Sequence, residues 1–238
     1  QCVELLLDRH ANVDAVDIDY YTPLHWASIS GHHQCIELLL DRHANVNADF
    51  NQWTPLHWAS RHGHHQCIEL LIDRGANIGA VDDNNDTPLH WASINGHHQC
   101  VELLLDRGAI INAVTISKWT PLHYASYSGH HQCIELLLDR GAIINAVDIK
   151  NTTPLHHASR NGHHQCIELL IDRGADKSIT NVRDDGRDSL LHLLLMYQSS
   201  LTNPLHAQGF GKTPEQVAKS SEIAQLIRDR GILIYLSI

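Results

Sequence analysis

The chain has 238 residues, a formal net charge of −10 at pH 7, 21 histidines and six cysteines. The acidic balance argues against a nucleic-acid partner, because binding to phosphates needs a clustered basic surface. No apolar run reaches the roughly 18 residues of a membrane-spanning helix, so we expect no direct membrane span.

Two phrases recur along the chain at a nearly fixed interval. The phrase Thr-Pro-Leu-His, first met at residues 22–25, returns after 32 residues and then three more times at intervals of 33. The phrase Gly-His-His-Gln-Cys, first met at residues 31–35, travels with it in every copy. A period of this size is typical of a repeat array in which each unit stacks on its neighbours.

Each unit predicts two short helices. Thr22 is a good N-cap and Pro23 suits the first helical position, so a helix of about two turns should begin there and end at Gly31. Residues 33–41 carry one apolar stripe at helical spacing, which predicts the second helix. The stripe consists of Cys35, Ile36, Leu39 and Leu40. Because neither helix is long enough to be stable alone, each unit should bury its stripe against its neighbours.

The repeats divide a single domain, residues 1–238, into four parts. Residues 1–14 match the second half of a unit, and residues 15–177 hold five near-identical units. Residues 178–211 form a degenerate unit, and residues 212–238 form a C-terminal capping unit with an apolar tail. Terminal units of a solenoid are expected to be atypical because one side faces water. An array that begins in mid-unit would suit a fragment of a longer protein.

The repeated residues resemble the ankyrin repeat. The match rests on Thr-Pro-Leu-His, the following Ala, Gly-His, the Leu-Leu-Leu run and Gly-Ala-Asn-x-Asn-Ala, and it covers roughly residues 1–177. The resemblance implies an all-α ankyrin-repeat solenoid of about seven helix-turn-helix units with extended hairpin-like loops. It also implies that the first-helix histidines bond near the capping threonine and the adjacent loop. These histidines are His25, His57, His90, His123 and His156.

The six cysteines share one position in the second helix of successive units. Packed helices lie about 8–10 Å apart, whereas a disulfide needs Cα atoms within about 7 Å. We therefore expect free, buried thiols in a reducing compartment, which is the cytoplasm, or the host cytosol for a secreted effector. The cysteines are Cys2, Cys35, Cys67, Cys100, Cys133 and Cys166.

The abundance of histidine raises a metal or a catalytic site as alternatives. His32 and Cys35 are spaced to share one metal, but a closed zinc site needs four converging ligands, and each unit offers the same two. The chain has no nucleophile motif and no phosphate-cradling glycine-rich loop, so we expect neither a cofactor nor enzymatic activity. The first histidine of each Gly-His-His phrase should instead hold a turn or the neighbouring unit.

The loop tips and the pair of residues before each helix-ending glycine differ between units, whereas the helices are nearly identical. Variation in a solenoid collects on its binding face, so we predict partner contacts on a concave face of loops and first helices. A ladder of rings inside the first helices, which begins at Trp26, is interpreted as packing between units. The predicted contact residues are Asp19, Tyr21, Phe50, Trp53, Arg61, His62, Asp83, Asp86, Trp119, Tyr127, Lys150 and Arg160.

Large aromatic residues on exposed tips are typical anchors of protein interfaces. On this interpretation, replacing Trp53 or Trp119 by alanine should weaken binding without destabilising the fold. The sequence therefore predicts a monomeric, non-catalytic scaffold for protein–protein interaction. The alternative is a targeting or regulatory region of a larger enzyme, channel or bacterial effector whose active part lies outside this sequence.

Overall fold

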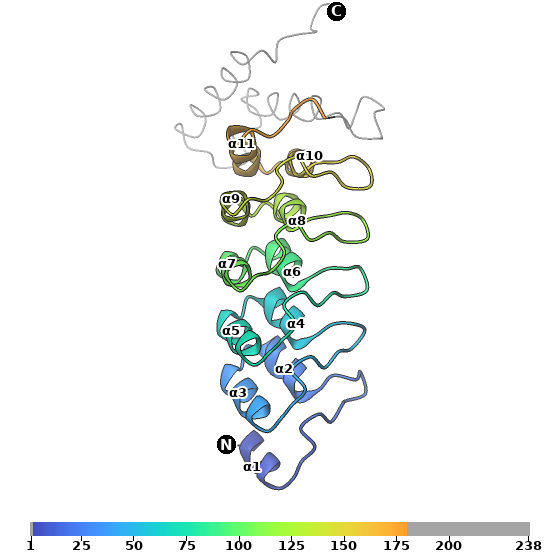
Figure 1. Cartoon of the computed structure of the whole chain (residues 1–238), viewed down its shortest axis with the longest axis vertical. Coiled ribbons are helices and arrows are strands. Elements are labelled where there is room, and N and C mark those ends of the chain that lie inside the picture. Colours follow the sequence, from blue (N-terminus) through green and yellow to red (C-terminus); the bar gives the residue numbers. More distant parts are fainter. Residues whose placement is uncertain (1, 180–238) are drawn as a thin grey trace, which may run out of the picture.

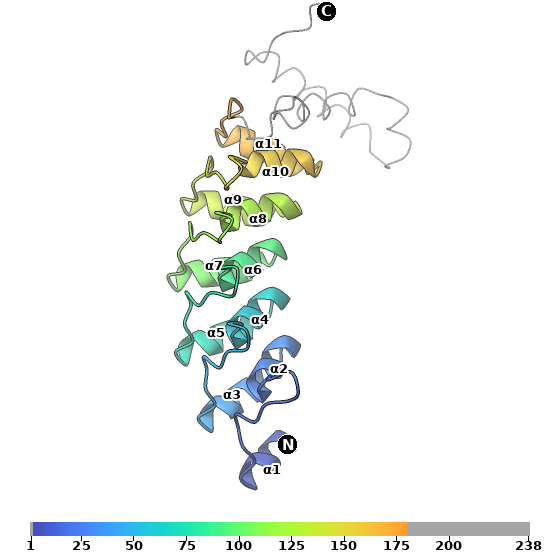
Figure 2. The same ribbon diagram turned by 90° about the vertical axis from the view of Figure 1, so that its right-hand side faces the viewer.

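The computed structural model describes residues 2–179, and every regular element in that range is an α-helix. The helices stand in two columns, and the hairpin-like loops project beyond the column of first helices (Figure 1). The view turned by 90° shows the units stacked one above the next (Figure 2). The predicted all-α solenoid is confirmed, whereas the predicted degenerate unit, capping unit and apolar tail lie, from residue 180 on, outside the described residues.

The array begins with α1 (Cys2–Asp8), which is a second-type helix without a described first helix before it. The first helices of the five units that follow are α2 (Pro23–Ser30), α4 (Pro55–His62), α6 (Pro88–Ile94), α8 (Pro121–Ser128) and α10 (Pro154–Arg160). The second helices are α3 (His33–Asp41), α5 (His65–Asp73), α7 (His98–Asp106), α9 (His131–Asp139) and α11 (His164–Asp172). The bounds predicted for the second helix, residues 33–41, are confirmed.

A reciprocal cap starts each first helix. In the first complete unit, the backbone N–H of Thr22 donates to Nδ1 of His25 at 3.2 Å, while the Thr22 side chain accepts from the His25 backbone. The other ring nitrogen of His25 donates to the carbonyl of Trp53 in the next unit at 3.1 Å. The predicted role is thus confirmed for His25, His57, His90 and His123, whose rings cap their own helix and bond to the following loop, whereas His156 shows the cap alone.

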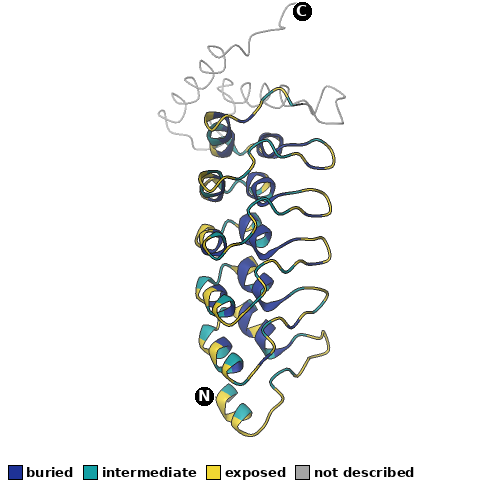
Figure 3. Ribbon diagram, viewed as in Figure 1, coloured by how far each residue is buried: buried dark blue, intermediate teal, exposed yellow. Residues whose placement is uncertain are grey.

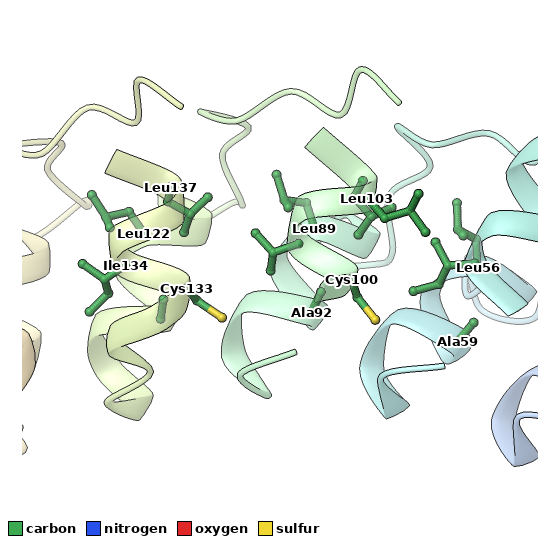
Figure 4. Close-up of a cluster of buried hydrophobic side chains, with 14 of the residues drawn as sticks. Leu56, Ala59, Leu89, Ala92, Cys100, Leu103, Leu122, Cys133, Ile134 and Leu137 are labelled. Atoms are coloured by element: carbon green, nitrogen blue, oxygen red, sulfur yellow. The ribbon is translucent and has the colours of Figure 1, made fainter. Parts of the chain in front are cut away.

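A hydrophobic core runs between the two columns through the whole array (Figure 3). In the central units, Leu89 and Ala92 of α6 meet Cys100 and Leu104 of α7, and all four are 0–1% exposed. Figure 4 shows the same set of side chains repeating in neighbouring units. Burial is therefore continuous along the array.

Most of the cysteines behave as predicted. Cys67, Cys100, Cys133 and Cys166 are buried and free, whereas Cys35 is free and half-buried. The side chain of Cys2 lies outside the described residues. Burial raises the pKa of the Cys100 and Cys133 thiols to about 12, so these sulfurs act as small apolar groups at neutral pH.

The first histidine of the Gly-His-His phrase bridges to the preceding unit in four of the five complete units, as expected. His130 Nε2 donates to the carbonyl of Ile94 at 3.0 Å, and the same bond recurs at His64, His97 and His163. The ring lies against the glycine that ends the preceding first helix. A Cβ atom on Gly96, whose φ is +75°, would lie 2.5 Å from Nδ1 of His130. Glycine is required there both by its left-handed backbone and by this close approach.

Ion pairs link the ends of successive second helices. Arg107 contacts Asp73 at 2.6 Å and Glu69 at 3.2 Å in the preceding unit. The arginines in this ladder are Arg42, Arg74, Arg107, Arg140 and Arg173, and each pairs with at least one carboxylate of the preceding unit. Because about half of each carboxylate side chain is exposed to solvent, each ion pair alone adds little to the stability of the fold.

A ladder of hydrogen bonds joins the turns that follow successive second helices, and one of these bonds is missing. The backbone N–H of Asn77 donates to the Asn47 side chain at 2.8 Å, and that of Ile143 donates to Asn112 at 3.0 Å. In the intervening unit, the residue equivalent to Asn47 and Asn112 is Gly79. Glycine has no side chain, so it offers no acceptor to the backbone N–H of the next turn. The φ of Gly79 lies outside the left-handed region, and an added Cβ would meet only the Asn77 side-chain oxygen at 3.7 Å.

We therefore expect the substitution Gly79→Asn to stabilise the protein by about 1 kcal/mol. It restores the missing side-chain acceptor and lowers the conformational entropy of the unfolded chain. Urea unfolding at pH 7 measures the gain. Gly79→Ala is the matched control, because it supplies only the backbone effect and should recover about half of the gain. A loss of stability in both variants would contradict the turn geometry described above.

Candidate protein-binding surface

Each projecting loop is a tight hairpin that ends just before the capping threonine, with five residues in four of the units and four residues in the loop at 50–53. In the loop at residues 82–86, the backbone N–H of Asp82 donates to the carbonyl of Asp86 at 3.0 Å, and Asn85 closes the turn at φ 62°. The residue in the position of Asn85 is left-handed in every loop: Tyr20, Gln52, Asn85, Lys118 and Asn151. This turn exposes the middle of the loop and carries its last residue back toward the first helices.

The last loop residue is therefore not an exposed tip, and the prediction for Trp53 and Trp119 is wrong in this respect. Both side chains are half-buried. The Trp53 ring lies 4.5 Å, between centroids, from Trp58 of its own unit and 4.5 Å from Trp91 of the next. Trp119 has the same arrangement, with His157 of the next unit at 4.3 Å. These rings pack between units.

Asp86 occupies the same loop position and is also wrongly predicted as exposed. Its side chain is 4% exposed, and it forms a side-chain hydrogen bond with Tyr124 of the next unit. Burial raises the pKa of Asp86 to about 6. Its Oδ1 atom has no hydrogen-bond partner. A carboxylate and a phenol thus replace the ring-on-ring contact found at Trp53 and Trp119.

A carboxylate at the start of the loop fixes the indole of the first helix in two units. Trp26 Nε1 donates to Asp17 Oδ2 at 2.8 Å, and Trp91 Nε1 donates to Asp82 Oδ2 at 3.0 Å. The unit between them differs, since Trp58 Nε1 is buried without a hydrogen-bond partner.

The single 32-residue interval explains this difference. The loop before Trp58 is shorter by one residue, so Phe50 and Trp53 pair directly as a two-residue hairpin. The two central residues, Asn51 and Gln52, have φ values of 48° and 63°, as a type I′ turn requires. The shortened loop brings no carboxylate to the indole nitrogen of Trp58. The 32-residue interval is visible in the sequence, but the loss of this hydrogen bond could not be predicted from it.

Arg61 lies over the ring cluster that results. Its guanidinium carbon is 5.3–5.6 Å from the ring centroids of Trp53, Trp58 and Trp91. Such contacts are attractive cation–π interactions and hold the charge in place. Arg61 and the adjacent His62 are both exposed, as predicted.

The remaining predicted residues divide into exposed and half-buried groups. Asp19, Asp83, Tyr127, Lys150 and Arg160 are exposed, and Tyr21 and Phe50 are half-buried. Sequence reasoning missed Trp26, which was assigned to packing and is 49% exposed, and Tyr20, which is 65% exposed. Tyr20 stacks on Phe50 at 6.0 Å. The signal for Tyr20 was present, because it also lies in a variable loop.

The match to known protein families agrees with this architecture. A family model described as "Ankyrin repeats (3 copies)" matches residues 1–82, 49–115, 74–148, 111–181 and 144–233. The chain belongs to the ankyrin-repeat family. Ankyrin repeats are generally protein–protein interaction modules. No curated protein matches the chain.

The described part of this ankyrin-repeat protein shows neither a metal site nor a membrane-spanning helix. Within residues 2–179, no three His, Cys, Asp or Glu side chains are grouped so that they could hold a metal ion. No helix in the same range is long and apolar enough to cross a membrane. The feature that distinguishes the units from one another remains the surface of loops and first helices.

Proposed function

We propose that this ankyrin-repeat protein is a non-catalytic binding module that engages a protein partner through its loops and first helices. The observation that carries the proposal is an asymmetry between the two sides of the array. The second helices carry the same arginine–carboxylate ladder in successive units. The loops and the first-helix ends differ from unit to unit, and such variation is typical of the binding face of a solenoid.

The side chains on this face suit an interface. Aromatic residues and arginine are enriched among the residues that dominate binding energy, and Trp26, Arg61 and Tyr127 are exposed here. Tyr127 packs beside Trp119 with ring centroids 5.5 Å apart, and Arg61 is held over three indoles. Side chains held by their neighbours lose less conformational entropy on binding.

The cellular compartment that we propose follows from the free cysteines. Buried free cysteines persist in reducing compartments, so we place the binding in the cytoplasm, with the protein acting as a monomer. Disulfide bonds between these cysteines are not needed to stabilise the array, because its hydrophobic core is continuous.

The substitution Tyr127→Ala tests the proposal. The partner is first isolated by affinity capture and identified by mass spectrometry, and its affinity for purified variants is then measured by titration calorimetry. Tyr127→Ala should weaken binding by about 2 kcal/mol while the melting temperature stays nearly unchanged. Gln132→Ala on the exposed side of α9 is the control and should bind like the wild type. If Gln132→Ala weakens binding and Tyr127→Ala does not, the partner uses the opposite side of the array.

A further inference from the structure

Arg61 differs from the five ladder arginines in having no acidic partner among the described residues. The five ladder arginines each contact a carboxylate of the preceding unit. In contrast, no carboxylate of the described residues, 2–179, lies within ion-pair distance of Arg61. Arg61 therefore presents an exposed guanidinium whose charge is not neutralised by a direct contact within the described array.

The rings beneath Arg61 prepare this group for a ligand. Trp53, Trp58 and Trp91 come from two consecutive units and lie within 5.6 Å of the guanidinium carbon. Their π faces attract the cation but accept no strong hydrogen bond from it, so its N–H groups stay available. A guanidinium is weakly hydrated compared with an ammonium group, which lowers the cost of pairing it at an interface.

The surroundings of Arg61 lack a competing acid at short range. Asp17 and Asp82 are engaged by the indole nitrogens of Trp26 and Trp91 at 2.8 and 3.0 Å. The shortened loop leaves Trp58 Nε1 with no carboxylate. The pKa of the neighbouring His62 is lowered by burial first and then by the charge of Arg61. Protonation of His62 beside Arg61 is therefore disfavoured.

We propose that Arg61 recognises a carboxylate side chain on an acidic peptide segment of the protein partner. This inference rests on the proposed function, because it names the partner chemistry for the same face. One planar guanidinium matches one carboxylate through two parallel hydrogen bonds. Phosphorylated residues are typically bound by clusters of arginines, whereas Arg61 is the one arginine over this ring cluster.

The flanks of Arg61 indicate apolar neighbours for that carboxylate. Trp26 belongs to α2 and Tyr127 to α8, and these helices lie on opposite sides of α4 along the array (Figure 1). Their exposed fractions are 49% and 45%. A segment that crosses several units would place its acidic residue on Arg61 and apolar side chains on these two rings.

A peptide selection tests this inference without a known partner. Random peptides displayed on phage are selected against the whole chain, and the enriched peptides are synthesised with each acidic residue replaced in turn by its amide. One such replacement should weaken binding to the wild type by about tenfold or more. The same replacement should have no effect on binding to Arg61→Gln. Arg140→Gln changes the net charge equally on the ladder side and should behave like the wild type.

The outcomes separate this inference from the proposed function. Arg61→Lys keeps the charge without the planar fork, so an affinity between those of the wild type and Arg61→Gln supports carboxylate pairing. Peptides that depend on Trp26 and Tyr127 but not on Arg61 would overturn the inference and leave the proposed function standing. Peptides that depend on none of the three would overturn both. Stronger binding of a phosphoserine peptide than of its glutamate counterpart would overturn the choice of a carboxylate.

Discussion

The melting temperature should fall steeply when the pH is lowered from 7 to 5. Three first-helix histidines, His57, His90 and His123, are 0–1% exposed, and burial lowers the pKa of each from 6.5 to about 4. Each Nδ1 atom accepts the N–H of its capping threonine, and each Nε2 atom lies within 3.2 Å of a carbonyl oxygen in the next unit. A neutral ring with hydrogen on Nε2 satisfies both contacts, and a proton on Nδ1 would remove the acceptor.

The sign of the effect follows from these pKa values. Above pH 6.5 both the folded and the unfolded chains hold these rings neutral, so their contribution to stability is fully present. As the pH falls below 6.5 the unfolded chain binds protons and the folded chain does not, which favours unfolding until the pH reaches about 4. At pH 5 each ring costs about 2 kcal/mol, or about 6 kcal/mol for the three.

Asp86 opposes part of this loss. Its folded pKa of about 6 lies above that of an unfolded aspartate, so lowering the pH relieves the cost of its buried charge. The gain at pH 5 is about 1 kcal/mol, which leaves a net loss of about 5 kcal/mol. Thermal unfolding followed by circular dichroism at pH 7, 6 and 5 measures the slope.

Two variants identify the groups responsible for that slope. His90→Gln removes one titrating ring and should flatten the dependence by about a third of the histidine contribution. Asp86→Asn removes the opposing group and should make the dependence steeper. A melting temperature that does not change between pH 7 and pH 5 would show that the rings are not held neutral by the fold.

The sequence was sufficient to predict the features that each unit repeats. The helix at residues 33–41, the cap at Thr22 and His25, and the buried cysteines depend on residues within one unit or on contacts common to all units. Those contacts are encoded in every copy, so the residue types of one unit and the resemblance to the ankyrin repeat were enough to predict them. The histidine bridge to the preceding unit followed for the same reason.

The sequence was not sufficient where one unit departs from the others. Asp86 lies in the position of Trp53 and Trp119, and its buried carboxyl group forms a hydrogen bond with Tyr124 in the following unit. The hairpin before Trp58 is one residue shorter than the others, and this removes the acceptor of Trp58 Nε1. Both effects arise from pairs of residues in different units or from backbone register, which the composition of a single loop does not show.

Removal of the Trp53 ring should destabilise the protein strongly, contrary to the expectation for an exposed binding residue. The ring lies between Trp58 and Trp91 at 4.5 Å from each and supports the guanidinium of Arg61. Truncation leaves a cavity between two units that the neighbouring rings fill only in part. We expect Trp53→Ala to lower the free energy of unfolding by about 2–4 kcal/mol, less than for a fully buried tryptophan.

Urea unfolding at pH 7 measures this loss, with Tyr127→Ala as the matched control. The Tyr127 ring is 45% exposed and leaves little cavity when removed, so its truncation should cost less than about 1 kcal/mol. The backbone of Trp53 is unchanged by the substitution, and its carbonyl still accepts from His25, so the loss reports the ring alone. If Trp53→Ala unfolds at the same urea concentration as the wild type, the ring is not an element of the packing between units. Trp53 would then return to the set of exposed partner contacts, and Arg61 would lack the support that makes it a fixed recognition point.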